Sequence, residues 1–538
     1  MGVEARKRGE RWRAVLCAAL FGLAGAAQAQ TLAREQVLHK GNGPEPETLD
    51  PHRGEGVSTS NILRDLFEGL TSEAPDGRVV PGAAERWEVS ADGRDYTFHL
   101  RENARWSNGD PLTAGDFVYG LRRSVDPATG SNYASILAPV ENAEAVIAGT
   151  LPPERLGVDA PDARTLHIRL RAPTGYFPGL LTHAAAYPVH RGSIERFGRY
   201  AFRPEHLVSN GAYKAVEWVV QSHVLLARNR FYWDDAHTTI ERVYHHCTED
   251  LSSEFKRYRA GELDWTEEIP VTQAPWIRAH IPQEFRVSPY LGVYYYGLNL
   301  TQPPFKDNPK LRRALTLAID RDVIVRKVLG TGELPATSFV PALPGYTPQT
   351  PDWAAWPRER RLAEARRLYA EAGYSPAHPL AIEIRYNTHE DHKKIATVIA
   401  AMWKQWLGVQ TTLVNQEFKV FLRDRTQKQV TQVFRASWIG DYDDPYTFAE
   451  LLASNNGRND MGYASDAYDA LLAQAAAEPD SAKRIALMEA AERRMLDDQP
   501  LIPIYFYVTK RLVKPWVVGW QGNIMDHQYT KTMKILAH

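Results

Sequence analysis

Two oppositely charged side chains in one short segment are the residues best suited to bind or transform a ligand. Arg435 and Asp441 belong to residues 433–445, which begin with alternating β-branched, aromatic and small residues and end in the turn sequence Gly-Asp-Tyr-Asp-Asp-Pro. This pattern predicts a strand followed by a turn. Because side chains alternate along a strand, both residues share one face, roughly 20 Å apart at about 3.3 Å per residue if the chain stays extended.

A cation and an anion at that separation suit a short zwitterionic chain. Its amino group would lie at Asp441 and its carboxylate at Arg435, where charge-assisted hydrogen bonds are strong. A plainer interpretation is also open, in which Asp441 caps a turn and Arg435 is an ordinary surface side chain. The choice between them depends on the rest of the chain.

Length and composition narrow the class of protein. A chain of 538 residues is too long for one core, so two or three domains are expected. The hydrophobic content of 44% and charged content of 24% are ordinary for a globular protein, and a formal net charge of -1 disfavours nucleic-acid binding. We expect no membrane insertion of the mature chain, because no later stretch approaches the ~18 apolar residues that a span needs.

The N-terminus has the three parts of a secretory signal peptide. A basic segment precedes the apolar residues 14–27, and residues 27–29 read Ala-Gln-Ala, which fits the A-x-A cleavage pattern. We therefore predict a signal peptide over residues 1–29, cleaved near Ala29, and a soluble periplasmic protein. Cleavage would leave Cys247 as the only cysteine, so no intrachain disulfide is expected.

Hydrophobic periodicity predicts alternating strands and helices. Ser58 or Thr59 is expected to cap the first helix, and Thr113 with Asp116 to form a capping box at another. The alternation of strands and helices indicates a mixed α/β fold. Strands are expected at residues 36–40, 164–171, 282–296, 380–386, 411–415, 502–508 and 512–518, hairpins at 84–101 and 211–226, and helices at 58–70, 311–329, 358–372, 393–407, 466–477 and 481–496.

Several blocks of sequence resemble one family. Residues 104–119, with the pattern WS-G-PLTA-DFV, are similar to the extracytoplasmic solute-binding proteins, family 5, of peptide ABC transporters, and within them to the periplasmic oligopeptide-binding proteins. The likeness covers nearly the whole mature chain. Further matching blocks follow in the same order at residues 125–127, 133–135, 210–213, 303–305, 312–315, 320–321, 386–388, 414–417, 433–445 and 511–516.

The resemblance implies a fold and a function. It implies an α/β, periplasmic-binding-protein-like fold, in which two α/β lobes close on a central cleft beside an extra domain. It also implies a monomeric receptor that binds short peptides with little side-chain specificity and delivers them to an inner-membrane ABC permease with its ATPase subunits. The mapped parts are lobe I at residues 30–68, 193–291 and 509–538, the extra domain II at 69–192, and lobe III at 292–508.

The resemblance also implies roles for individual residues. Asp441 matches the family's anchor for the peptide α-amino group. Arg435, Arg425 and His392 match groups that receive carboxylate ends at different peptide lengths. Contacts along the cleft are implied for Glu55, Val57, Tyr133, Tyr290, Phe418 and Trp438. Of these, the aromatic residues Tyr133, Phe418 and Trp438 also fit plain core positions.

Several positions depart from the family's pattern. They add negative charge on one side of the implied cleft and remove positive charge on another, so a preference for basic or specially modified peptides is expected. A binding protein specialised for murein peptides or dipeptides is therefore the alternative. The departures are Leu329 for a lysine, Gly297 for an acid, Glu267 and Glu268 for two asparagines, and Gly292 with Ile439 for a cysteine pair.

A secreted hydrolase or metal-dependent enzyme is the competing hypothesis, and the residue patterns do not support it. His389 and His392 are three positions apart, whereas a zinc-protease helix needs four. The histidines and cysteine of residues 244–247 are adjacent on a predicted strand, so neighbours point to opposite faces. The sequence also lacks a Gly-x-Ser-x-Gly nucleophile elbow. We expect a binding protein without a cofactor.

Overall fold

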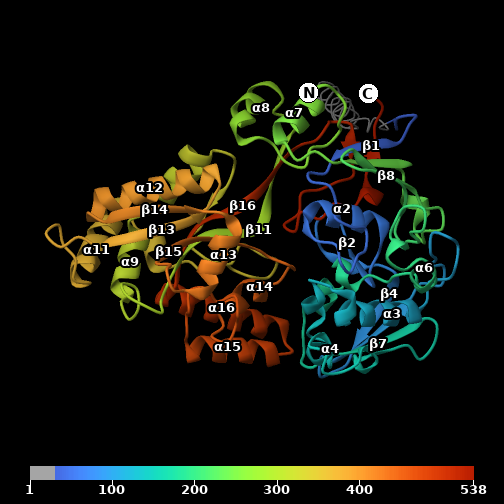
Figure 1. The fold of residues 1–538 in the computed structure, drawn as a ribbon, viewed down its shortest axis with the longest axis horizontal. Coiled ribbons are helices and arrows are strands. Elements are labelled where there is room, and N and C mark those ends of the chain that lie inside the picture. The colour runs from blue at the N-terminus through green and yellow to red at the C-terminus, as the bar shows by residue number, and fades with distance from the viewer. Residues whose placement is uncertain (1–30) are drawn as a thin grey trace, which may run out of the picture.

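Two long antiparallel strands connect two bodies. The computed structural model describes residues 31–538, except the side chains of Glu390, Phe418 and Lys419, so the predicted signal peptide lies outside the described residues. Strands β11 (Phe285–Leu298) and β16 (Leu501–Leu512) pair along their length and run from one body into the other (Figure 1). Their pairing shifts between Pro289 and Val293 and again between Tyr294 and Tyr295, so the ladder is irregular near its middle.

The body on the left of Figure 1 is built on a six-stranded sheet between two layers of helices. On β11, Tyr294 and Tyr296 pack under one layer, while Val293 and Tyr295 pack under the other, as strand alternation requires. In spatial order the strands are β12 (Leu334–Pro335), β16, β11, β15 (Val433–Ile439), β13 (Ala381–Asn387) and β14 (Gln410–Gln416). The helices are α9 (Pro309–Leu317), α10 (Arg321–Val323), α11 (Arg358–Glu371) and α12 (Glu390–Leu407) for the first layer, and α13 (Phe418–Gln427), α14 (Tyr446–Ala449), α15 (Asp466–Ala477) and α16 (Ser481–Asp498) for the second.

The other body contains two four-stranded sheets, each with a hydrophobic core of its own. The first sheet has the order β1 (Val37–Gly41), β10 (Arg242–His246), β9 (His223–Arg228) and β8 (Tyr213–Val219), and α2 (Gly56–Leu66) packs on it. The second has β4 (Ala84–Val89), β5 (Asp95–Leu100), β7 (Thr165–Arg169) and β6 (Val158–Asp159), with α3 (Ala114–Val125), α4 (Ala143–Ile147) and α5 (Phe177–Leu180). Shorter elements are β2 (Thr71–Glu73), β3 (Val79–Pro81), α6 (Arg191–Phe197), α7 (Leu251–Arg259), α8 (Ala274–His280), β17 (Val517–Val518) and β18 (Lys534–Ile535).

The expected mixed α/β fold is confirmed. The cores are separate clusters. The division into lobe I, domain II and lobe III stays a prediction, and these names are kept for the residue ranges given above. The C-terminal segment returns to the start of the described chain, since Ala33 N–H donates to Ile535 O at 2.8 Å. None of the helices in residues 31–538 is long and apolar enough to cross a membrane.

Local predictions succeed where both interacting residues lie close together in the sequence. Thr113 and Asp116 form the expected capping box, and Asp116 accepts hydrogen bonds from the Thr113 N–H and hydroxyl at 2.8 Å each. The predicted cap at Ser58 or Thr59 is wrong: α2 begins at Gly56, whose φ of 78° turns the chain into the helix earlier than expected.

Two longer elements also differ from expectation. The helix predicted over residues 311–329 is divided, because Asp320 caps a new start at α10 and a π-helix follows at Ile324–Leu329. The two C-terminal strands predicted at residues 502–508 and 512–518 are one long strand, β16, followed by the short β17.

Two glycines that depart from the family's pattern are explained by packing on β15. Gly292 of β11 lies opposite Ile439, and a Cβ at Gly292 would come within 2.3 Å of the Ile439 side chain. A Cβ at Gly297 would likewise lie 2.3 Å from the Phe434 ring. The larger residues on β15 therefore occupy the space that side chains on β11 would need.

A buried ion pair fixes the turn that follows β15. Arg484 of α16 donates to both carboxylate oxygens of Asp444 at 2.7 Å each, and both side chains are only 9% exposed. This bidentate geometry holds residues 440–445 against α16.

Removing the cation of this pair is expected to destabilise the protein strongly. Arg484→Leu leaves the Asp444 carboxylate buried and unpaired, so the free energy of unfolding should fall by about 3 kcal/mol. Urea denaturation followed by tryptophan fluorescence measures this change. Arg494→Leu is the control on the same helix, because Arg494 pairs with Asp498 at a half-exposed position and should matter by less than about 1 kcal/mol. Equal losses in the two variants would contradict a dominant role for the buried pair.

Candidate functional site

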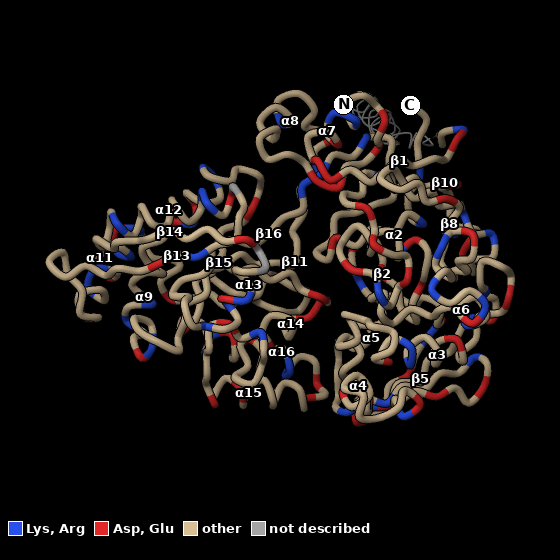
Figure 2. Tube along the Cα trace, in the orientation of Figure 1, with Lys and Arg blue, Asp and Glu red and all other residues tan. Residues whose placement is uncertain are grey.

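The end of β15 and the turn after it lie where lobe III faces the other body. Figure 2 shows acidic residues at the tip of lobe III beside α14, on the side toward that body. Strand β15 ends at Ile439, so Asp441 lies in a bend and not in an extended continuation of the strand. Arg435 lies within the strand and pairs in register with Tyr296 of β11.

Arg435 has neutral partners. Its Nη2 donates to the Ser437 hydroxyl at 2.9 Å and to the Tyr507 hydroxyl at 3.3 Å, and its guanidinium lies 5.0 Å from the centre of the Tyr294 ring. Its Nε is buried and finds no hydrogen-bond partner within the described part of the chain. The guanidinium is therefore held in place by hydroxyl and aromatic groups while its charge stays available to an anion.

His392 of α12 joins Arg435 at the same tyrosine. Its Nδ1 lies 3.4 Å from the Tyr294 hydroxyl, and its ring centre is 5.5 Å from that of Tyr294. Burial, and then the positive charge of Arg435, lower the pKa of His392 to about 3. The imidazole is therefore neutral near pH 7, so it offers this corner a hydrogen-bonding group without a second charge.

Arg425 of α13 differs from Arg435 because an acid already neutralises it. Its Nε lies 2.6 Å from the Asp460 carboxylate, and the two side chains are 20% and 10% exposed. Both Arg425 and Arg435 lie near Tyr295. Burial raises the pKa of Tyr295, and the two positive charges partly oppose this shift. The structure thus brings the three expected groups into one region, and of the two arginines Arg435 is the one without an acidic partner among the described side chains.

Asp441 lies at the other end of the segment. Its backbone N–H donates to the Thr447 hydroxyl at 3.3 Å, and the Trp438 indole N–H donates to the same oxygen at 3.2 Å. Burial raises the pKa of Asp441, and the positive charge of Arg458 offsets this effect in part. Arg458 also lies 5.3 Å from the Trp438 ring. The carboxylate is therefore partly desolvated, which strengthens its attraction for a cation.

The other body contributes Tyr133 and Glu55 near Asp441. Burial raises the pKa of the Tyr133 hydroxyl, and the negative charges of Asp441 and Glu55 raise it further, so both carboxylates lie near Tyr133. Asn132 donates a hydrogen bond to Glu55. Two acids from different bodies thus approach one tyrosine, and the region between them favours a cationic group.

The remaining expected site residues are distributed differently. Glu267 accepts a hydrogen bond from Asn61 at 3.3 Å, and burial raises its pKa, while burial raises that of the nearby Tyr290 to about 12. Glu268 is half exposed, 4.0 Å from Lys510. No contact recorded for these described residues joins them to Arg435 or Asp441. Val57 is half exposed on α2, and the Phe418 side chain lies outside the described residues.

The sequence did not reveal the groups that hold the charged residues. Tyr507 of β16 and Asn387 of β13 lie beside Arg435, and Thr447 joins Asp441 to Trp438. Tyr294 belongs to a tyrosine-rich stretch of β11. Its place between Arg435 and His392 depends on the pairing of β11 with β15, which the sequence pattern does not specify.

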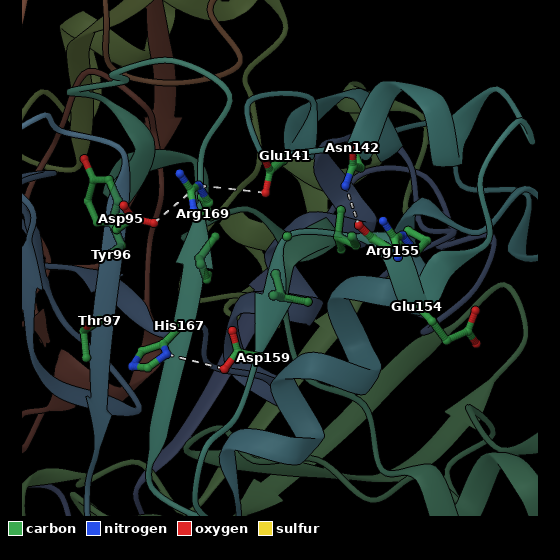
Figure 3. A pocket seen from close by; sticks show the side chains of 14 residues that line it. Asp95, Tyr96, Thr97, Glu141, Asn142, Glu154, Arg155, Asp159, His167 and Arg169 are labelled. Atoms are coloured by element: carbon green, nitrogen blue, oxygen red, sulfur yellow. Dashed lines mark hydrogen bonds and ion pairs between the residues drawn. The ribbon is translucent and has the colours of Figure 1, made fainter.

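A separate concavity of about 570 Å³ lies on domain II (Figure 3). Arg169 lies between Asp95 and Glu141, with its Nε at 3.7 and 3.9 Å from their carboxylates. All these side chains are about half exposed, so water screens their charges. The described residues also include no group of three or more His, Cys, Asp or Glu that could hold a metal ion. The charged region at β15 and the turn after it is therefore the stronger candidate site.

Two bodies joined by crossover strands, with unlike charges on the part of lobe III that faces the other body, are typical of a two-lobed ligand-binding protein. The model of the bacterial extracellular solute-binding proteins, family 5 Middle, matches residues 78–460. The chain belongs to this family of bacterial extracellular solute-binding proteins.

Relatives in the family differ in the ligand that their names state. The chain is 42% identical to the periplasmic oligopeptide-binding protein OppA of Escherichia coli, over 94% of each chain. It is 40% identical to the probable deoxycholate-binding periplasmic protein YgiS of Escherichia coli, over 94% of this chain and 95% of that one. Overall identity therefore does not decide the ligand.

Two solved structures bear on the arrangement of the lobes. The unliganded open form of the periplasmic murein tripeptide binding protein MppA superposes with a TM-score of 0.86 at 40% identity, covering 95% of this chain and 99% of that one. The Haemophilus influenzae OppA complex with RPPGFSPFR gives 0.77 at 39% identity, covering 94% and 100%. Since the identities are nearly equal, the difference indicates that the lobes here resemble the open arrangement.

The low pKa of His392 can be tested directly. An NMR titration of the His392 ring should show a neutral imidazole down to about pH 4, because burial and Arg435 both disfavour its protonation. Arg435→Met removes one of these two causes and should raise the pKa of His392. Arg425→Met is the matched control, because Asp460 already neutralises that charge. A His392 ring that titrates near its ordinary value of 6.5 would contradict the geometry described.

Proposed function

We propose that the protein is a periplasmic receptor that binds short peptides in a closing cleft, with little side-chain specificity. It delivers them to an ABC-type import permease and its ATPase subunits in the inner membrane. The observation that carries this proposal is the pair of charges on one segment: Arg435, whose hydrogen-bond partners are neutral, and the partly desolvated Asp441. The names of OppA and MppA support peptides as the ligand class.

Recognition of the amino end is assigned to Asp441. An α-ammonium group beside this carboxylate forms charge-assisted hydrogen bonds in a site with little water. Tyr133 and Glu55 approach from domain II and lobe I, so the amino group is enclosed from both sides of the cleft. Trp438 forms the apolar wall beside it, and its indole N–H is already engaged with Thr447.

Recognition of the carboxylate end is assigned to Arg435 with His392. The guanidinium is pre-positioned by Ser437 and Tyr507, so little ordering is needed when an anion arrives. Arg425 is a further candidate for the carboxylate of longer peptides. To bind it, Arg425 would exchange its present partner, Asp460, for the peptide carboxylate. Binding by termini leaves side chains free to lie in hydrated pockets, where water adapts the hydrogen bonding.

Closure is assigned to the crossover strands. A bend at β11 and β16 carries lobe III toward the other body, and a ligand that contacts both bodies stabilises the closed arrangement. The likeness to an unliganded open form supports this description. The predicted signal peptide, the periplasmic names of the relatives and the family's solute-binding role favour a monomeric, non-enzymatic receptor outside the inner membrane.

A receptor specialised for murein peptides or dipeptides is the second candidate. Glu267 and Glu268 favour it, because they add carboxylates to lobe I near Tyr290, where a cationic side group of a modified peptide would be attracted. The MppA likeness points the same way. The two candidates differ in how strongly affinity depends on the ligand's side chains.

The amino anchor is the first point to test. Asp441→Asn should weaken the binding of trialanine by about 100-fold, because the ammonium loses its charged partner in a desolvated site. Isothermal titration calorimetry measures the affinity. Asp466→Asn, at an exposed position at the start of α15, is the control and should leave it unchanged. Unaltered binding by the Asp441→Asn protein would remove the basis of the proposal.

Side-chain dependence separates the two candidates. If lobe I selects cationic groups, the wild-type protein should bind Ala-Lys-Ala about tenfold more tightly than trialanine, and a Glu267→Gln, Glu268→Gln double variant should lose that preference. Competition calorimetry compares the peptides. The double variant retains the anchor residues, so its affinity for trialanine should stay close to that of the wild type. Equal affinities for both peptides in the wild type would favour the general receptor.

A further inference from the structure

One aromatic side chain of domain II enters the part of lobe III that carries the amino anchor. Tyr176 immediately precedes α5, and its ring is parallel to that of Tyr442, with centroids 4.9 Å apart and an angle of 6°. The Tyr446 ring lies 5.9 Å away at 20°. Figure 2 shows α5 and α14 where the two bodies approach each other away from the crossover strands. Tyr442 is the next residue after Asp441.

The ring of Tyr176 is also covered by a cation. The Arg484 guanidinium lies 5.0 Å from its centroid, and this same Arg484 holds Asp444 through two hydrogen bonds of 2.7 Å. Tyr442, Tyr446 and Arg484, all from lobe III, therefore surround one ring from domain II. Such stacked and cation–π contacts have a defined geometry, so they orient the groups that make them.

Tyr442 packs mainly with the other body. Its side chain is 9% exposed and belongs to the core of domain II, together with Tyr96 and Phe177, although its backbone belongs to the turn of lobe III. A crevice of about 640 Å³ opens beside this contact, between Thr174 and Gly175 on one side and Asp444 and Pro479 on the other. The crevice separates domain II from lobe III beside these rings. At this point the two bodies therefore meet through the aromatic cluster of Tyr176, Tyr442 and Tyr446.

We propose that Tyr176 is a positioning residue for Asp441. The inference rests on the proposed peptide-binding function and assigns to domain II a part in recognising the amino group. On one side of the turn, Thr447 holds the Asp441 backbone N–H at 3.3 Å. On the other side, the stack with Tyr176 fixes the direction of Tyr442 and therefore of the carboxylate that precedes it.

A purely structural contact would have a different effect. With a structural role alone, loss of the stack would lower stability and weaken the binding of all ligands alike. A positioning role acts through Asp441, so it changes the affinity only for ligands that carry an amino group. The preference for a free amine over a blocked one therefore distinguishes the two roles.

The test compares trialanine with N-acetyl-trialanine by calorimetry. The wild-type protein should prefer the free amine, and Tyr176→Leu, which keeps an apolar side chain but removes the ring, should reduce that preference about tenfold. Tyr176→Phe retains the ring and should restore the wild-type preference. Tyr119→Leu on α3 of the same domain is the matched control, because the contact recorded for that ring is with Arg191. Added to Asp441→Asn, the Leu substitution should cause no further loss.

The possible failures are separable. A Tyr176→Leu protein that keeps the full preference overturns the inference while leaving the proposed function intact. A wild-type protein that binds neither peptide, or does not distinguish them, overturns the proposed function and with it the inference. If circular dichroism shows that Tyr176→Leu does not fold, Tyr176→Met is used in its place, since methionine fills irregular apolar gaps. An unchanged preference in that variant also overturns the inference.

Discussion

The structure depends on a positive charge held away from bulk water without an acid to balance it. Placing an ion in a poorly solvated site costs several kcal/mol unless hydrogen bonds and opposite charge compensate. For Arg435 the compensation comes from the hydroxyls of Ser437 and Tyr507 and the face of Tyr294. These neutral groups orient the guanidinium but do not cancel its charge. The guanidinium therefore keeps a charge that an anionic ligand would balance, and strands from three parts of the chain converge on this one residue.

The crossover strand β11 links that charge to the rest of the molecule. Its alternating side chains belong to the two cores of lobe III, so the strand cannot slide without disturbing both. The pairing of β11 with β16 changes between Pro289 and Val293, between the stretch near the other body and the stretch inside lobe III. Since Arg435 and the turn with Asp441 both belong to lobe III, any movement of this lobe as a unit would carry the two residues together.

The sequence predicted the parts of the site that depend on local spacing. Alternation identified β15 and placed Arg435 on it, and the turn residues marked the bend that carries Asp441. The resemblance added His392 and Arg425, and the structure brings both near Arg435. The pairing of Arg425 with Asp460 was not foreseen, because charge balance depends on which loop folds back to the helix.

Long-range contacts could not be predicted from the sequence, because they also depend on how distant segments pack in the fold. Tyr176 and Tyr442 lie far apart in the chain, and each is an ordinary aromatic residue in its local pattern. The division of the helix predicted over residues 311–329 was equally hidden, since its apolar periodicity continues through the break. In both cases tertiary packing determines the outcome, whereas local propensity is only a weak guide.

The ligand class is a matter of charge complementarity more than of overall identity. Relatives of nearly equal similarity have names that state oligopeptides and deoxycholate, so the shared fold tolerates both kinds of ligand. A ligand with a single carboxylate could satisfy Arg435, but it would leave Asp441 partly desolvated, with its burial offset only in part by the charge of Arg458, which is unfavourable. A peptide satisfies both residues at once. Under the proposed function, the acids near Tyr133 therefore matter as much as the guanidinium does, because their negative charge favours a ligand that carries an amino group.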